Sequence, residues 1–191
     1  MDRDPRVDKI VRLWAAAGHS NYGGEAVTQL EHALQAAMFA AQQGATPQLV
    51  SAALLHDVGH LLHHLPENAP EQGIDDVHEE LGAHWLAKYF LPATVEPVRL
   101  HVFAKRYLCH ADPTYFAQLS APSMQSLWLQ GGPLNAAEAA EFEQQPHFAA
   151  AVQLRRWDEA AKVPQLTTPA LEHFVPHLEQ SLLPEEPVNA R

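Results

Sequence analysis

The sequence contains a single cysteine, Cys109, in 191 residues, and this excludes an internal disulfide framework. Long apolar runs are also lacking, since no stretch approaches the roughly 18 consecutive apolar residues that a membrane-spanning helix needs. Basic residues are scarce: 12 Lys and Arg stand against 23 Asp and Glu, and the net charge is −11 with His neutral. Such a chain repels a phosphate backbone, so we expect neither nucleic acid nor a membrane as a partner.

Several catalytic motifs are absent as well. The chain has no His-Glu-x-x-His pair, no Cys-x-x-Cys pair, no glycine-rich phosphate loop and no Gly-x-Ser-x-Gly turn. Zinc-protease, zinc-finger, nucleotide-binding P-loop and serine-hydrolase interpretations therefore have no support. The charged first residues are not followed by the apolar core of a signal peptide, and we expect a cytoplasmic protein.

The apolar residues that are present, 47% of the chain, are largely Ala and Leu, which favour helices over strands. They recur at helical spacing, and no β-type alternation of useful length is found. We therefore predict an all-α helical bundle. Its length suits one domain over residues 1–191, with a core at about 20–162 and a frayed tail at 184–191.

Caps and turn residues predict where these helices begin and end. Gly18 is expected to close the first helix in a left-handed conformation, and Asp76 with Glu79 resembles a capping box for the fourth. Pro47 is expected to start a third helix that runs to about Leu62. The predicted helices lie at about 4–18, 26–43, 47–62, 77–89, 95–110, 113–121, 123–130, 136–143, 147–162 and after 168.

Histidine is the compositional anomaly, with 13 residues, and a metal site is expected from that number alone. The adjacent pair His56-Asp57 follows an apolar run, and an Asp carboxylate there can bridge two metal ions. His60 lies four residues after His56 and is predicted on the same helix face. The plain alternative is a buried helix whose histidine is satisfied by hydrogen bonds.

Other predicted helices supply matching side chains. Glu25, Gln29 and His32 fall on one face of the second helix at i, i+4 and i+7, although a solvated face would also explain the first two. His101 and Lys105 lie one turn apart, which is unfavourable beside a metal unless an anion lies between them. Lys105 is therefore a candidate anion-binding residue, with an ordinary surface lysine as the alternative.

Six side chains together supply what two neighbouring octahedral ions need, with one Asp bridging and positions left open for a ligand. Ligation rich in imidazole suits Fe, Mn, Zn or Ni better than Mg or Ca. The predicted metal ligands are His32, His56, Asp57, His78, His101 and Asp158.

The order His32, His56-Asp57 and Asp158 resembles the metal ligands of the HD-domain superfamily, whose all-helical core binds one or two metals. His78 and His101 match the two extra histidines of its dinuclear members. The resemblance therefore implies a helical bundle with a central dinuclear metal site. Most members of that superfamily are metal-dependent phosphohydrolases.

A narrower resemblance is stronger. The segments 22–32, 56–60, 78–79 and 101–107 are similar to the diiron oxygenases that cleave the carbon–phosphorus bond of 1-hydroxyphosphonates. Known members oxidise 2-amino-1-hydroxyethylphosphonate to glycine and phosphate, or its N-trimethyl analogue to glycine betaine and phosphate. The resemblance implies a mixed-valent Fe(II)/Fe(III) pair, with a small hydroxyphosphonate and O2 as partners. Nothing in the sequence indicates an obligate protein partner.

The same resemblance implies roles for residues around the metals. Lys105 would neutralise the phosphonate, while His60 and Arg155 would contact the phosphonate or support the ligands. Glu25 would hold the substrate ammonium, and Tyr22 would occupy an iron until substrate displaces it. Further predicted phosphonate or pocket donors lie one turn apart, at Ser126 and Gln130.

Two alternatives stay open at this point. An HD-type phosphohydrolase of a nucleotide or phosphate monoester would not need Tyr22, Glu25 or Lys105, and a non-catalytic helical module would keep the ligands only for folding. The substrate amine is also open, because a primary ammonium needs hydrogen-bond acceptors whereas a trimethylammonium needs negative charge and aromatic faces.

Overall fold

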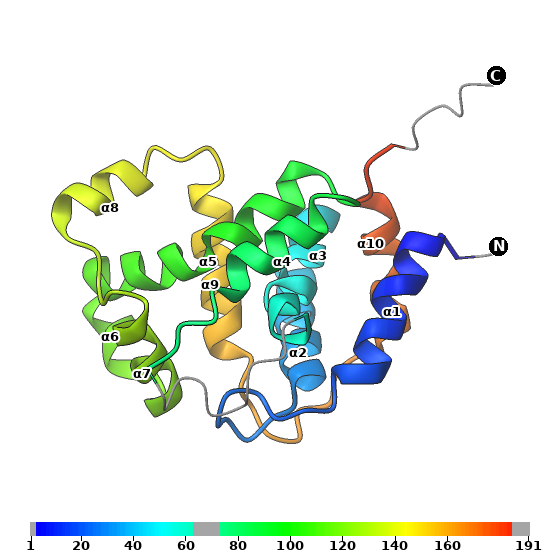
Figure 1. Cartoon of the computed structure of the whole chain (residues 1–191), viewed down its shortest axis with the longest axis horizontal. Coiled ribbons are helices and arrows are strands. Elements are labelled where there is room, and N and C mark those ends of the chain that lie inside the picture. Colours follow the sequence, from blue (N-terminus) through cyan, green and yellow to red (C-terminus); the bar gives the residue numbers. More distant parts are fainter. Residues whose placement is uncertain (1–2, 63–72, 185–191) are drawn as a thin grey trace.

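The computed structural model describes residues 3–62 and 73–184, and in these ranges the regular structure is helical (Figure 1). The β-type pairing in the same ranges is limited to isolated bridges, Asn21 with Thr28 and Phe90 with Leu182. The predicted all-α class is confirmed. Across the described part of the chain, every helix is too short or too polar to cross a bilayer. The α-helices are α1 (Pro5–Ala17), α2 (Gln29–Gln42), α3 (Pro47–Leu55), α4 (His78–Leu86), α5 (Pro92–Ala111), α6 (Pro113–Gln118), α7 (Ala121–Leu129), α8 (Ala136–Phe142), α9 (Phe148–Ala160) and α10 (Val175–Gln180), with 3-10 helices η1 (Val58–Leu61) and η3 (Leu171–Phe174).

Helix α3 lies inside the bundle and packs against α2, α5, α9 and α10. Its residues Val50, Ala52, Ala53, Leu54 and Leu55 are all fully buried. A helix that is apolar on every side is stable only where every side is covered. The end of α3 therefore lies in the interior of the protein, and the residues that follow it directly, His56 and Asp57, are buried as well.

Small side chains bring α2 close to this central helix. Ala33, Ala36, Ala37 and Ala40 are at most 1% exposed. Because the distance between packed helices depends on the side chains between them, a stripe of alanines allows a close approach. His32 lies at the start of that stripe and is held against the same interface.

The remaining helices cover the two ends of the bundle (Figure 1). Helices α1 and α10 lie together at one end, and α6, α7 and α8 lie at the other. The main hydrophobic core includes Trp14 of α1 and Leu178 of α10, so it extends beyond residues 20–162. The single-domain assignment stays a prediction. Apart from Pro184, the tail predicted to fray lies outside the described residues.

Gly18 ends α1 as predicted, but the predicted left-handed conformation is wrong, because its φ is −69°. A Cβ at this position would lie 2.6 Å from the carbonyl oxygen of Trp14 and 3.0 Å from the Cβ of Leu30. Glycine is therefore needed here for the close approach of α1 to α2 rather than for a positive φ.

The predicted start of the second helix at residue 26 is also wrong. Thr28 caps α2 by accepting a hydrogen bond from the backbone N–H of Glu31, whose side chain accepts from the backbone N–H of Thr28. This reciprocal capping box fixes the first turn three residues later than predicted. Glu25 consequently lies in the loop before α2 and does not share a helix face with His32.

The third helix does not reach Leu62 as predicted. Helix α3 ends at Leu55, and after His56 and Asp57 the chain continues as η1. A 3-10 helix has about three residues per turn, so His60 loses the four-residue alignment with His56. His63 and His64, expected to be exposed loop histidines, lie outside the described residues.

The capping box predicted for the fourth helix is absent. Val77 occupies the N-cap of α4 with a φ of 49°, and no side chain caps this end. The Asp76 carboxylate instead accepts hydrogen bonds from the ring Nδ1 atoms of His60 and His78, at 2.7 and 2.8 Å. The prediction failed because Val77 rather than Asp76 occupies the N-cap, although Asp76 also accepts a long hydrogen bond of 3.4 Å from the backbone N–H of His78.

Candidate metal centre

The six predicted ligands converge in the middle of the bundle, although they come from five separate segments. Each of them is at most 7% exposed. Histidines and carboxylates are this deeply buried only when they are paired or bind a metal. The contributing segments are α2 for His32, the end of α3 for His56 and Asp57, the first turn of α4 for His78, α5 for His101 and α9 for Asp158.

Two glycines allow α4 to lie directly on η1. A Cβ on Gly59 would overlap the carbonyl oxygen of His78, and a Cβ on Gly82 would lie 3.2 Å from the backbone nitrogen of Gly59. Larger side chains at either position would push the two segments apart. The close contact brings His78 to Asp57.

The carboxylate of Asp57 lies between two pairs of histidines. Its Oδ2 atom lies 3.5 Å from Nε2 of His32 and 3.2 Å from Nε2 of His56. Its Oδ1 atom lies 3.3 Å from Nε2 of His78 and 3.5 Å from Nε2 of His101. This is the arrangement that a bridging carboxylate between two metal ions requires.

Asp158 completes the half that contains His32 and His56. Its Oδ1 atom lies 3.4 Å from Nε2 of His32 and 3.7 Å from Nε2 of His56. The ligand atoms of these three residues lie within 4.8 Å of one another, as do those of Asp57, His60 and His78 in the other half. The structure therefore contains a candidate metal centre with two neighbouring positions.

Hydrogen bonds on the far side of each ring fix the orientation of the histidines. Nδ1 of His32, His56 and His101 lies within 2.9 Å of a backbone carbonyl oxygen, and Nδ1 of His78 faces Asp76. A carbonyl can only accept, so Nδ1 carries the proton and Nε2 presents a lone pair.

These lone pairs face one another. The two Nε2 atoms lie 3.0 Å apart in the pair His32–His56 and 3.1 Å apart in the pair His78–His101. Two lone pairs at that distance repel unless a proton or a metal cation lies between them. Asp57 Oδ2 and Asp158 Oδ1 are also buried with no hydrogen-bond partner among the described residues. The donor set therefore fits two cations held by four imidazoles and two carboxylates, and the assignment of each ligand stays a prediction.

The electrostatics of the centre favour positive charge. Burial lowers the pKa of His56, but the carboxylates of Asp57 and Asp158 outweigh burial and raise the pKa to about 10. Burial also lowers the pKa of His78, which Asp57 and Asp76 raise to about 10. The same pockets stabilise a metal cation for the same reason.

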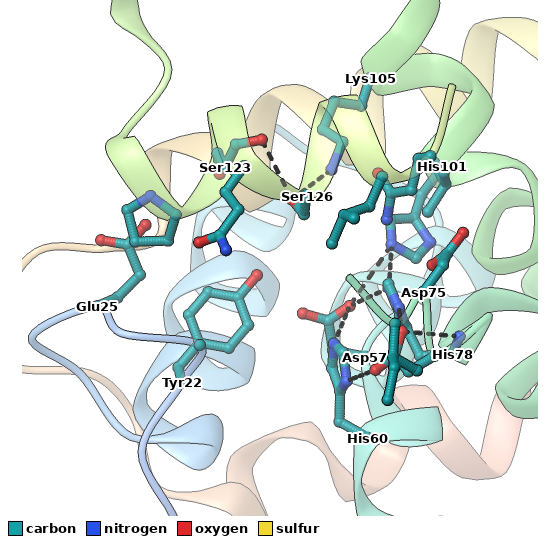
Figure 2. Close-up of a pocket in the computed structure, with 18 of the residues that line it drawn as sticks. Tyr22, Glu25, Asp57, His60, Asp75, His78, His101, Lys105, Ser123 and Ser126 are labelled. Carbon is teal, nitrogen blue, oxygen red and sulfur yellow. Dashed lines mark hydrogen bonds and ion pairs between the residues drawn. The ribbon is translucent and has the colours of Figure 1, made fainter. Parts of the chain in front are cut away.

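Tyr22 reaches the centre from the loop before α2. Its ring stacks on the ring of His32 with a centroid separation of 3.8 Å, and its hydroxyl points into the pocket (Figure 2). Burial, and then the charge of Asp57, raise the pKa of Tyr22 well above its usual value, so the phenol is neutral. Gly23 and Gly24 follow with φ of 44° and 82°, which lets the loop turn sharply. Metal ligation by Tyr22 stays a prediction.

Lys105 enters the same pocket from α5 and is 4% exposed. Its Nζ donates to the hydroxyl of Ser126 at 2.9 Å (Figure 2). Burial, and then the positive charge of Arg155, lower the pKa of Lys105 to about 7. Gln130 lines the pocket nearby, and its buried Oε1 lacks a hydrogen-bond partner among the described residues. The predicted anion-binding residues therefore do lie together.

Arg155 lines the pocket but already has three acceptors within the protein. Its guanidinium donates to the hydroxyl of Tyr115 at 2.6 Å and to the carboxylates of Asp158 and Glu159. It holds one oxygen of Asp158 while the other oxygen faces the histidines. Its predicted contact with substrate stays a prediction.

His60 lies against the half of the centre formed by His78. The two rings stack with centroids 4.0 Å apart, and Nε2 of His60 lies 3.9 Å from Oδ1 of Asp57. Asp76 accepts from both rings, and sequence reasoning missed this role because it assigned Asp76 to a helix cap.

Sequence reasoning also missed Lys162. Its Nζ lies 3.4 Å from Oε1 of Glu25 and donates to Ser123 at 2.6 Å and to Glu159 at 2.9 Å. Lys162 lies beyond α9, which ends at Ala160, so helical spacing from Asp158 does not place it, and no sequence motif pointed to it. The role predicted for Glu25 in holding a substrate ammonium stays a prediction.

The candidate centre forms one side of a cavity of about 120 Å³. Figure 2 shows Asp57, His78 and His101 on one side, Lys105 and Ser126 beside them, and Tyr22 and Glu25 on the opposite side. A small anion in this cavity would meet the metal positions and the lysine together.

Comparison with known proteins shows which family the chain matches. The HD-domain family model matches residues 30–125, which include five of the six predicted ligands; Asp158 lies beyond the match. Hydroxymethylphosphonate dioxygenase of Gimesia maris is 46% identical over 185 residues, which cover 93% of this chain and 88% of that protein. The glycine-betaine-forming [1-hydroxy-2-(trimethylamino)ethyl]phosphonate dioxygenase of Leisingera caerulea is 40% identical over 180 residues, 94% of this chain and 92% of that protein. An uncharacterized protein of Acanthamoeba polyphaga mimivirus is 34% identical over 170 residues, 88% of this chain and 78% of that protein.

Proposed function

Because the chain belongs to the HD-domain family and is closely related to two of its dioxygenases, we propose that it uses O2 to cleave the carbon–phosphorus bond of a 1-hydroxyphosphonate. The balanced reaction is RCH(OH)PO3²⁻ + O2 → RCO2⁻ + HPO4²⁻ + H⁺. The carbon is oxidised from the alcohol to the carboxylate level, and O2 accepts the four electrons.

The observation that carries this proposal is the division of the Asp57 carboxylate between two histidine pairs. It supports two adjacent metal ions, and the cavity beside them also holds the buried Lys105. Two iron ions, one Fe(II) and one Fe(III), would supply Lewis acidity for the hydroxyl and phosphonate oxygens and electrons for O2. Four imidazoles and two carboxylates suit iron by ligand type.

The chain's own residues bind and orient the substrate. Lys105 and Ser126 donate to a phosphonate oxygen, and the positive charge of Lys105 offsets the phosphonate charge in a site that excludes water. The neutral hydroxyl of Tyr22 points into the cavity from the side opposite Asp57, His78 and His101, and it moves away when substrate enters. Its glycine-containing loop provides the conformational freedom for that movement.

The test combines anaerobic iron loading with electron paramagnetic resonance. A mixed-valent signal that changes when hydroxymethylphosphonate or an amino analogue is added supports the proposal. Admission of O2 should then release phosphate with one O2 consumed per phosphate.

The phosphohydrolase alternative predicts a different outcome. A hydrolase would release phosphate from phosphate monoesters without O2, would accept Mn or Co, and would be indifferent to Tyr22→Phe. Anaerobic turnover of monoesters, together with no O2 uptake on any hydroxyphosphonate, would overturn the oxygenase proposal.

A further inference from the structure

A set of paired charges closes the side of the cavity that lies away from the metal positions. Glu25 lines the cavity, and its carboxylate accepts from the hydroxyl of Ser120 at 2.5 Å. Lys162 lies behind it, 3.4 Å from Glu25, and also donates to Ser123 and Glu159. The Glu25 side chain is 15% exposed and that of Lys162 is 9% exposed, so solvent screens the pair only weakly.

This pairing changes what Glu25 can bind. A carboxylate facing a cavity attracts an ammonium group only while its own charge is unbalanced. Here Lys162 lies 3.4 Å from that carboxylate, and its other carboxylate partner, Glu159, is also paired with Arg155. The Lys162 charge therefore offsets that of Glu25, and a substrate ammonium near Glu25 would also approach the Lys162 ammonium. Like charges brought together in a poorly solvated site repel strongly.

The other described residues around the cavity offer no substitute for Glu25. Asp57 and Asp76 are engaged with the histidines, and Asp75 is exposed to solvent on the metal side, across the cavity from Glu25 (Figure 2). Tyr22 is the sole Phe, Tyr or Trp among the described lining residues, and one face of its ring is covered by His32. A trimethylammonium group therefore finds no aromatic cage in this part of the chain.

With Tyr22 in place, the partly open cavity has room for a short substrate. Its volume is about 120 Å³, and a protein cavity of about 150 Å³ holds one benzene molecule, which has six non-hydrogen atoms. Hydroxymethylphosphonate also has six non-hydrogen atoms, whereas the trimethylamino compound has eleven.

We propose that Lys162 is a specificity-determining residue which, by neutralising Glu25, makes the site select a 1-hydroxyphosphonate without a cationic substituent. Hydroxymethylphosphonate is the smallest compound of this class. The inference rests on the proposed function, because it assumes that the cavity receives a hydroxyphosphonate.

The test compares hydroxymethylphosphonate with 2-amino-1-hydroxyethylphosphonate in the iron-loaded enzyme. The measured quantity is the ratio of their kcat/KM values, in which differences in folding or iron content cancel because both substrates meet the same preparation. We expect the wild type to favour hydroxymethylphosphonate by about tenfold or more. Lys162→Met, which removes the charge at similar length, should move the ratio towards the amino compound by about tenfold or more. Lys162→Arg keeps the charge and should keep the wild-type preference.

Two results would overturn the inference: a wild-type preference for the amino compound, or a ratio that Lys162→Met leaves within about twofold of the wild type. Failure of the proposed function looks different, since neither compound would then yield phosphate with O2. Anaerobic calorimetry of both compounds on wild type and Lys162→Met still decides the role of Lys162 in that case through the ratio of Kd values. Binding of neither compound would overturn both proposals.

Discussion

The two sides of the cavity bury similar side chains in opposite ways. On the metal side, Asp57 and Asp158 each keep a buried oxygen without a hydrogen-bond partner among the described residues, and the nearby Nε2 lone pairs face one another. On the far side, the carboxylates of Glu25 and Glu159 are paired with Lys162 and Arg155, and serine hydroxyls complete the hydrogen bonds.

This difference distinguishes the metal side, which can bind a further charged ligand, from the opposite wall of the cavity (Glu25, Lys162 and Glu159), which cannot. Unpartnered buried acceptors cost about 1–3 kcal/mol each, so they persist where a ligand offsets the cost. A network whose members already satisfy one another gains little from an additional ion. The metal side is therefore the side that binds cations, and the far side limits the shape of the cavity more than it adds charge to it.

The largest expected effect comes from removing the bridge between the two halves of the centre. Asp57→Asn replaces one anionic oxygen by an N–H group that points towards a metal position. We expect iron content to fall to one ion per chain or fewer and O2-dependent phosphate release to fall to background. Metal analysis and an O2 electrode measure both quantities.

Asp75→Asn is the matched control for this substitution. Asp75 lines the same cavity, but it is exposed and lies outside both groups of candidate ligands. The Asp75→Asn variant should keep two irons per chain and an activity close to that of the wild type. Two irons retained by Asp57→Asn would refute the bridging role.

The next largest effect is expected at Lys105, the buried lysine beside the metal positions. Lys105→Met should reduce kcat/KM by about 10²–10³-fold, because a preorganised charged donor is lost from a buried site. Lys88→Met, on an exposed residue, should have little effect. An equal loss of kcat/KM in the two variants would show that Lys105 does not bind the substrate.

The depressed pKa of Lys105 adds a pH dependence with a defined sign. With a pKa of about 7, Lys105 is charged at lower pH and neutral at higher pH. We therefore expect kcat/KM to fall as the pH rises through about 7, and this decline should be weaker in Lys105→Met. A decline of equal size in both enzymes would come from another group, such as the phosphonate.

A smaller effect is expected from the carboxylate that orients the metal side without facing a metal position. Asp76→Asn leaves one acceptor oxygen for two imidazole N–H groups, and metal affinity should fall by about 10–100-fold. Excess iron should restore most of the activity, which a general folding defect would not allow. Glu80→Gln, on an exposed residue of the neighbouring helix α4, is the control. Unchanged iron retention during dialysis against a chelator would contradict the prediction.

Sequence reasoning named the side chains that meet on the metal side, whereas on the wall it named Glu25 but not Lys162. The ligand set follows from residue type and order, because adjacent His56-Asp57 and isolated histidines on apolar helices have few other uses. The helical class followed from composition, and the prediction of iron came from a family resemblance.

The errors in the predicted helices and caps share a physical cause: tertiary contacts outweighed the local preferences on which the predictions were based. His60 left the face of His56 because the chain tightens into η1, and this tightening lets Gly59 pack against α4. Asp76 was assigned to a cap but is held by two imidazoles. Lys162 meets Glu25 across 137 positions of sequence, a pairing that no spacing rule in one chain reveals.

The smallest expected effect tests whether the wall is as inert as its paired charges imply. Ser120 donates to Glu25 and also caps α7, where it accepts from the backbone N–H of Ser123. Ser120→Ala should therefore cost about 1 kcal/mol of unfolding free energy from the lost cap, measured by denaturant titration. Its activity on hydroxymethylphosphonate should change by less than about threefold, because Lys162 still balances Glu25. Asn135→Ala removes the cap of α8, whose residues do not line the cavity, and should match both outcomes. A loss of activity well beyond that of Asn135→Ala would mean that the wall takes part in holding the reacting group, and the contrast between the two sides would fail.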